Sequence, residues 1–292
     1  MSFLRTHAQK NAHVLYNPRF FSNFAAGNSA RLTVKYNKTN KHYKTMWLTD
    51  SSIGRKLVMS ITGTCLVLFL LFHASMNLAL IFSEDAYNWI CRMLGANWYA
   101  LIGTGVLALG VLLHMLFGVI LTIQNRRARG NDRYAVTSRQ EGVDWESQNM
   151  LALGLVILGF LCLHLFNLWF KMQFQEVTGL KTGAFDPQNG AAYVKYLFTG
   201  IYDPAQIVNP ELLTMPQWAH PVYCCLYLIW IAAIWFHLTH GVWSAMQTMG
   251  LSSNIWLPRI KVIGNIVATI ICLMFAAVIF YYLGMYIGSV CA

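Results

Sequence analysis

Charged side chains are scarce in this chain of 292 residues. Asp, Glu, Lys and Arg make up only 11% of it, whereas hydrophobic residues make up 57%. Soluble globular domains carry about 25% charged residues, so the composition excludes an ordinary soluble protein. The hydrophobic residues gather in long apolar runs, and the sequence therefore predicts an all-α integral membrane protein.

Several chemical motifs are also missing. The seven cysteines form no CxxC or CxxCH, which argues against a zinc knuckle and against covalently attached c-type haem. No GxGxxG dinucleotide fingerprint is present. Residues 1–50 contain no apolar stretch of the kind found in a signal peptide, and we expect them to form a basic cytoplasmic extension.

Five apolar runs each reach the roughly 20 residues that cross a bilayer core of about 30 Å. They cover approximately residues 56–82, 98–123, 150–170, 221–249 and 262–288. A long connection, about 171–220, joins the third run to the fourth. We therefore predict five transmembrane helices within one membrane domain, residues 51–292.

Basic residues are distributed unevenly along the chain. Ten of the 21 Lys and Arg residues precede or begin the first run, and five follow the second. The positive-inside rule places the N-terminus in the cytoplasm, with the C-terminus and the 171–220 connection outside. We expect a multi-pass protein of the cell inner (cytoplasmic) membrane. No aromatic-interleaved motif accompanies the basic residues, so we predict no nucleic-acid partner.

Two motifs occur twice, in matching order, along the first four runs. The motif G-x9-H is found as Gly63-TCLVLFLLF-His73 and Gly154-LVILGFLCL-His164. The motif H-x3-G-V is found as His114-MLF-Gly118-V and His237-LTH-Gly241-V. The chain therefore has the pattern of two helical hairpins followed by an unpaired fifth helix.

Four histidines inside membrane spans indicate function, because an ionisable group is costly there. At 1.5 Å per residue, His73 and His164 lie about 10–15 Å from the outer ends of their spans, and His114 and His237 about 24 Å. Equal depth pairs His73 with His164, the outer pair, and His114 with His237, the inner pair. We predict that four of the helices form a bundle in which each pair ligates one b-type haem iron.

The repeated glycines fit this arrangement. Gly118 and Gly241 lie one turn from the inner ligands, where a missing side chain would make room for a porphyrin. Gly63 and Gly154 lie about 15 Å from the histidines of their own motif, level with the inner pair. Small-residue helix packing is the alternative explanation. His240 has Phe117 as its counterpart in the repeat, and we interpret it as a packing histidine.

The segments SSIGRKLVMSITG, HMLFGV, GLVILGFLCLH and FHLTHGVWSAMQTMG together carry a resemblance. They resemble the dihaem cytochrome b membrane subunit of succinate:quinone oxidoreductases (succinate dehydrogenase or fumarate reductase), in its five-helix, single-subunit form. The resemblance covers residue 51 to the end and implies two haem b groups. It also implies a flavoprotein partner with covalent FAD, an iron–sulfur partner, membrane lipid, and a quinone as substrate.

Further site residues follow from that resemblance. Near the outer pair, Glu84 or Asp85 is our candidate for protonating the quinone, with a solvated helix end as the alternative. Ser60 and Gln148, near the inner boundary, are candidates for binding haem propionates. Some family members carry a glutamate where this chain has Trp235, and that difference favours menaquinone reduction by a succinate dehydrogenase.

Two other functions compete with this one. The chain could be the cytochrome b subunit of another respiratory complex, of the hydrogenase or formate dehydrogenase type. Those proteins place their ligands at other spacings. It could also be a haem-free structural membrane anchor in which the histidines only pack.

Overall fold

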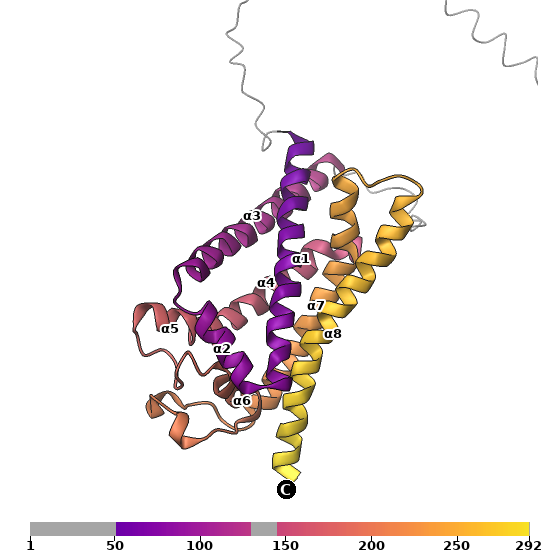
Figure 1. The fold of residues 1–292 in the computed structure, drawn as a ribbon. Helices are drawn as coiled ribbons and strands as arrows, with labels where there is room; N and C mark the ends of the chain where they lie inside the picture. Colours follow the sequence, from indigo (N-terminus) through magenta and orange to yellow (C-terminus); the bar gives the residue numbers. More distant parts are fainter. Residues whose placement is uncertain (1–50, 130–144, 292) are drawn as a thin grey trace, which may run out of the picture. The chain divides into compact units, whose positions relative to one another are not determined.

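The computed structural model describes residues 51–129 and 145–291. The predicted extension at residues 1–50 and the link at 130–144 lie outside the described residues. The described chain is helical (Figure 1). Its elements are α1 (Ser52–Phe82), α2 (Glu84–Leu94), α3 (Trp98–Arg129), α4 (Trp145–His164), the π-helix η1 (Leu165–Trp169), α5 (Gln173–Thr178), α6 (Gly190–Thr199), the 3-10 helices η2 (Pro204–Gln206) and η3 (Pro210–Leu212), α7 (Ala219–Thr248) and α8 (Trp256–Cys291).

Five of the described helices are long and apolar enough to cross a membrane, which confirms the predicted number. They are α1, α3, α4 continued by η1, α7 and α8. All of them begin before the predicted apolar run or end after it. Hydropathy locates only the part that partitions into lipid, whereas polar first turns such as Trp145–Asn149 continue the same backbone hydrogen bonding.

Four of these helices pack around one another in a closed order. Helix α1 packs against α3 and α7, and α4 packs against the same two helices. The pairs α1 with α4 and α3 with α7 therefore occupy opposite corners of the group. Helix α8 packs against α7 and α1, outside this ring of four. Helices that follow one another along the chain are thus neighbours in this ring, as in an antiparallel four-helix bundle.

The long helices divide their apolar residues between lipid and protein. Helices α1 and α3 expose large apolar side chains such as Leu68 and Val106, which suits contact with acyl chains. The buried core instead gathers where α6, α7 and α8 meet. Leu197, Cys224 and Tyr282 are each at most 1% exposed there.

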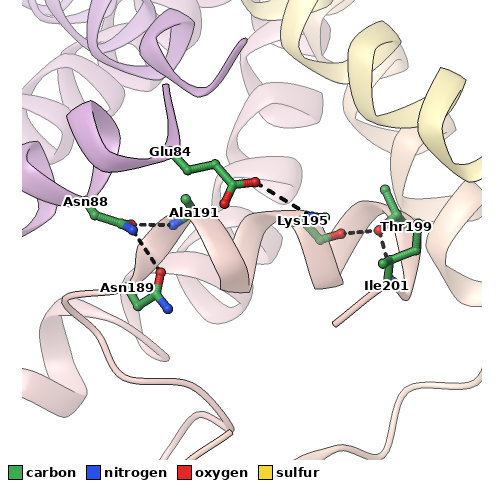
Figure 2. Close-up of polar contacts among 7 residues, drawn as sticks. All are labelled: Glu84, Asn88, Asn189, Ala191, Lys195, Thr199 and Ile201. Carbon is green, nitrogen blue, oxygen red and sulfur yellow. Dashed lines mark hydrogen bonds and ion pairs between the residues drawn. The ribbon is translucent and has the colours of Figure 1, made fainter. Parts of the chain in front are cut away.

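We call α2, α5, α6, η2 and η3, with their connections, the cap. Helix α2 was not predicted, because it is short and polar. Its N-cap residue is Ser83, whose hydroxyl accepts a hydrogen bond from the Ala86 amide. Its Asn88 fastens it to α6, since the side-chain oxygen accepts from the Ala191 amide and the side-chain nitrogen donates to Asn189 (Figure 2). Asn88 thereby caps the first turn of α6 from a neighbouring helix.

Candidate functional site

The four predicted histidines meet in two pairs inside the ring of helices. The ring centroids of His73 on α1 and His164 on α4 lie 5.9 Å apart. Those of His114 on α3 and His237 on α7 lie 6.3 Å apart. Each pair thus joins two helices at opposite corners, and the partners are those that equal depth in the sequence predicted.

The spacing within each pair fits an iron between the two rings. A metal–histidine nitrogen bond is about 2 Å long, and the ring centroid lies about 1 Å behind the nitrogen, so two rings on one iron have centroids about 6 Å apart. Both observed separations are close to that value. Each pair of histidines could therefore hold the iron of one haem.

The two G-x9-H glycines lie against the rings of the inner pair. A Cβ placed on Gly63 would be 3.1 Å from Cε1 of His114, and a Cβ on Gly154 would be 3.9 Å from Cε1 of His237. Each motif therefore contributes its histidine to the outer pair and its glycine to the inner pair. At Gly63 the approach is so close that any other residue would displace the ring.

The two H-x3-G glycines differ from each other. A Cβ on Gly118 would meet Cε of Met59 at 3.3 Å, so this glycine permits close packing of α3 on α1. That is the alternative role considered for the motif. A Cβ on Gly241 would meet no described atom within 4 Å, apart from its own helix backbone and chain neighbours. The side of α7 one turn beyond His237 therefore faces open space at Gly241.

A cavity of about 470 Å³ opens near the inner end, between α1, α3 and α7. Lys56, Ser60 and Gln247 line it together with Ser244. Ser60 is buried and its hydroxyl donates to the Lys56 carbonyl. Gln148, the other predicted propionate ligand, lies in the first turns of α4 and is not one of the described residues that line this cavity.

The outer pair lies among aromatic rings. Phe69 stacks on His73 with centroids 5.3 Å apart, and Phe275 of α8 lies 5.7 Å from the same ring. On the other side, Trp230 and Tyr227 of α7 lie 5.3 and 6.2 Å from His164. These rings fix the outer histidines by packing.

Immediately after His164 the helix widens into the π-helix η1, a feature that often marks functional sites. Asn167 within it is 1% exposed, and the Tyr193 hydroxyl from the cap donates to its carbonyl. Burial raises the pKa of Tyr193, so its hydroxyl keeps its proton and remains a donor.

Buried polar atoms without a hydrogen-bond partner cluster at this place. Among the described residues they are Nδ1 of His164, Nδ2 of Asn167, the Tyr227 hydroxyl and Nε1 of Trp230. The Asn167 and Tyr227 side chains are near neighbours, but their geometry is not that of a hydrogen bond. Such groups are costly to bury unpaired, and a polar ligand or water would satisfy them.

The positions of Tyr227 and Trp230 beside His164 were not predicted, although the sequence contains a spacing signal for Tyr227. Tyr227 stands ten residues before His237, which is the same interval that separates Gly63 from His73. The interval places Tyr227 about 15 Å along α7, level with the outer pair. Comparison of the two hairpins does not reveal Tyr227, because the residue at the equivalent position, ten residues before His114, is Thr104 and not an aromatic residue.

Glu84 and Asp85 lie in the exposed first turn of α2. Glu84 forms an ion pair of 3.7 Å with Lys195 of α6 (Figure 2). Both acidic residues line a polar cleft of about 400 Å³ in the cap, together with Arg92 and Gln206. Their position matches the solvated helix end that was considered as the alternative.

Two other predicted details can be located. His240 lies on α7 with its ring 4.8 Å from Trp243, as a packing histidine would. Trp235, where some members of the resembled family have a glutamate, donates from Nε1 to the Thr269 hydroxyl of α8 at 3.0 Å.

Comparisons with protein-family models, curated protein sequences and solved structures gave no significant match.

Proposed function

We propose that this chain is the membrane cytochrome b subunit of a succinate:quinone oxidoreductase. It would bind two b haems, one between His73 and His164 and one between His114 and His237. The observation that carries the proposal is the meeting of these rings in two pairs at 5.9 and 6.3 Å, both close to the separation that one iron requires.

Haem iron supplies one-electron redox chemistry, and the chain's residues would determine where this chemistry occurs. The two pairs are separated by about the ten-residue interval of the G-x9-H motif, or 15 Å along a helix. Electrons could therefore pass between the two membrane faces in two short steps. The flavin and iron–sulfur chemistry would belong to partner subunits on the cytoplasmic side, where the positive-inside rule also places the N-terminus.

The quinone would bind near the outer pair. The unpaired buried donors Asn167, Tyr227 and Trp230 would suit its carbonyl oxygens. Glu84 and Asp85 remain our candidates for exchanging protons with solvent, since both line the cleft in the cap. If Glu84→Gln and Asp85→Asn each leave menaquinone turnover unchanged at normal haem content, their role is refuted.

The decisive experiment is purification of the complex from its native membrane. We expect a sharp b-type alpha band in the reduced-minus-oxidised spectrum and two haems per copy of this chain. We also expect a flavoprotein with covalent FAD and an iron–sulfur subunit to co-purify.

Each competing function gives a different result. A haem-free anchor gives no alpha band. A hydrogenase or formate dehydrogenase subunit gives the band with different partners, and one haem per chain refutes the two-pair arrangement.

A further inference from the structure

Thr62 of α1 touches the ring of His114. Its hydroxyl oxygen lies 3.3 Å from Nδ1 of that histidine. The neighbouring residue is Gly63, whose missing side chain lets the ring approach α1 this closely. The segment that ends in the first G-x9-H glycine therefore presents two polar groups to this inner histidine, the Thr62 hydroxyl and the Met59 carbonyl.

The hydrogen of the Thr62 hydroxyl is already used within α1. The hydroxyl donates to the Val58 carbonyl at 2.8 Å, and the Met59 carbonyl is also within reach at 3.1 Å. A hydroxyl has one hydrogen and two lone pairs. Toward His114 the Thr62 oxygen can therefore only accept, which requires the proton of a neutral ring to be on Nδ1.

The repeat shows that this contact is peculiar to one histidine. The residue equivalent to Thr62, immediately before Gly154, is Leu153, which is buried and has no polar side-chain atom. Accordingly, Nδ1 of His237 has no hydrogen-bond partner among the described residues. The two rings of the inner pair thus differ in whether anything fixes their tautomer.

We propose that Thr62 is a positioning residue that, beside the Met59 carbonyl, holds His114 as the Nδ1–H tautomer, with the Nε2 lone pair available to the inner haem iron. The inference rests on the proposed function, since it presupposes haem at the inner pair. A ligating histidine that donates its other N–H becomes a more basic ligand. A more basic ligand favours ferric over ferrous iron and lowers the reduction potential of the inner haem.

The test is redox titration of the purified complex carrying Thr62→Val, which keeps the shape and removes the hydroxyl. We expect the midpoint potential of the inner haem to rise, by up to about tenfold in the one-electron equilibrium constant, or about 59 mV. The outer haem serves as an internal reference and should not shift. Thr62→Ser should restore the wild-type potential, because serine keeps the acceptor.

A matched control is available two residues along the same helix. Thr64 makes the same kind of intrahelical bond, to the Ser60 carbonyl at 2.9 Å. Thr64→Val should therefore leave both potentials unchanged. If Thr62→Val does not retain haem, Thr62→Ala removes the same hydroxyl without adding a methyl group.

Three results would overturn the proposal. They are unchanged potentials in both hydroxyl-free variants, an equal shift of both haems, and a Thr62→Ser variant that behaves like valine. Any of these, with two haems in the wild type, refutes the role of Thr62 alone. A wild-type complex without haem refutes the proposed function as well.

Discussion

The inner and outer histidine pairs have similar spacing but different surroundings. The inner rings lie against the G-x9-H glycines of their own hairpins, and His114 also contacts the Thr62 hydroxyl and the Met59 carbonyl of α1. The outer rings lie among Phe69, Phe275 and Trp230, beside a π-helix. Small residues let helices and a planar group approach closely, whereas aromatic rings fill space around the ligands.

The surroundings of the two histidine pairs suit two different tasks. The inner rings lie against glycines, which would suit a site that holds a bound planar cofactor. The outer surroundings contain several buried donors without partners, which suits a site where a polar molecule comes and goes. Substitutions at each pair test whether the two tasks are separate.

The largest expected effect is loss of one haem by substitution of an inner histidine. His237→Ala and His114→Ala should each reduce the haem content from two per chain to one, and the double variant should lose no more. Combining His237→Ala with His73→Ala should remove both haems. Haem per chain is measured by the pyridine haemochrome method, with His240→Ala as a control that keeps both.

Additive losses from His114→Ala and His237→Ala would contradict the pairing across opposite corners. Loss of a haem in His240→Ala would instead show that the repeat misidentified the ligand on α7.

Substitution of Tyr227 should affect the quinone and spare the haems. Tyr227→Phe removes one hydroxyl beside His164, and loss of one hydrogen bond of about 1.4 kcal/mol raises the quinone KM about tenfold. Tyr281→Phe, on an exposed part of α8, is the matched control. A normal KM with two haems would show that the unpaired donors serve packing or bound water.

Addition of a methyl group at Gly63 should disturb the inner pair selectively. The new Cβ would lie 3.1 Å from His114, and overpacking of this kind costs about 1–3 kcal/mol. We expect Gly63→Ala to lower inner-haem occupancy and to shift its alpha band. Gly159→Ala is the control, because a Cβ there would meet no atom within 4 Å among the described residues, other than its own helix backbone and chain neighbours. Equal effects of the two variants would refute the close approach.

The smallest effect concerns the cap, which covers only the outer end. Burial raises the pKa of the Cys91 thiol on α2 to about 11. Alkylation of Cys91 in a variant that retains only this cysteine should be slow at pH 8 and accelerate about tenfold per pH unit as thiolate forms. Because the folded pKa is the higher one, the protonated thiol stabilises the fold below about pH 9, and this contribution is lost toward pH 11. Rapid labelling at pH 7 would show that the cap opens readily.

Hydropathy and spacing predicted the parts of this protein that repeat. Five helices follow from runs of apolar residues, and the meeting of His73 with His164 follows from depth along straight helices. Ligation of haem stays a prediction. The π-helix was not predictable, because its hydrogen bonds span one residue more than those of an α-helix and leave no mark in the sequence of Leu165–Trp169.

The polar contacts of the site could not be predicted from the sequence either. The sequence does not distinguish Thr62 from its neighbours, since an intrahelical hydroxyl bond and a contact with a histidine ring look the same in sequence. Helix α2 was missed because eleven mixed residues carry little hydropathy signal. Such features depend on tertiary neighbours, such as the Asn88 bonds to α6.

Helix α8 has a consequence for the surrounding lipid. Its 36 residues extend about 54 Å, which exceeds a hydrocarbon core of about 30 Å by more than a tilt of about 40° can absorb. Part of its apolar surface is covered by the cap instead, where Val278, Ile279 and Tyr282 are buried and Phe198 of α6 stacks on Tyr282. The cap, rather than acyl chains, therefore covers this part of α8, and the bilayer has to match only the apolar length that remains.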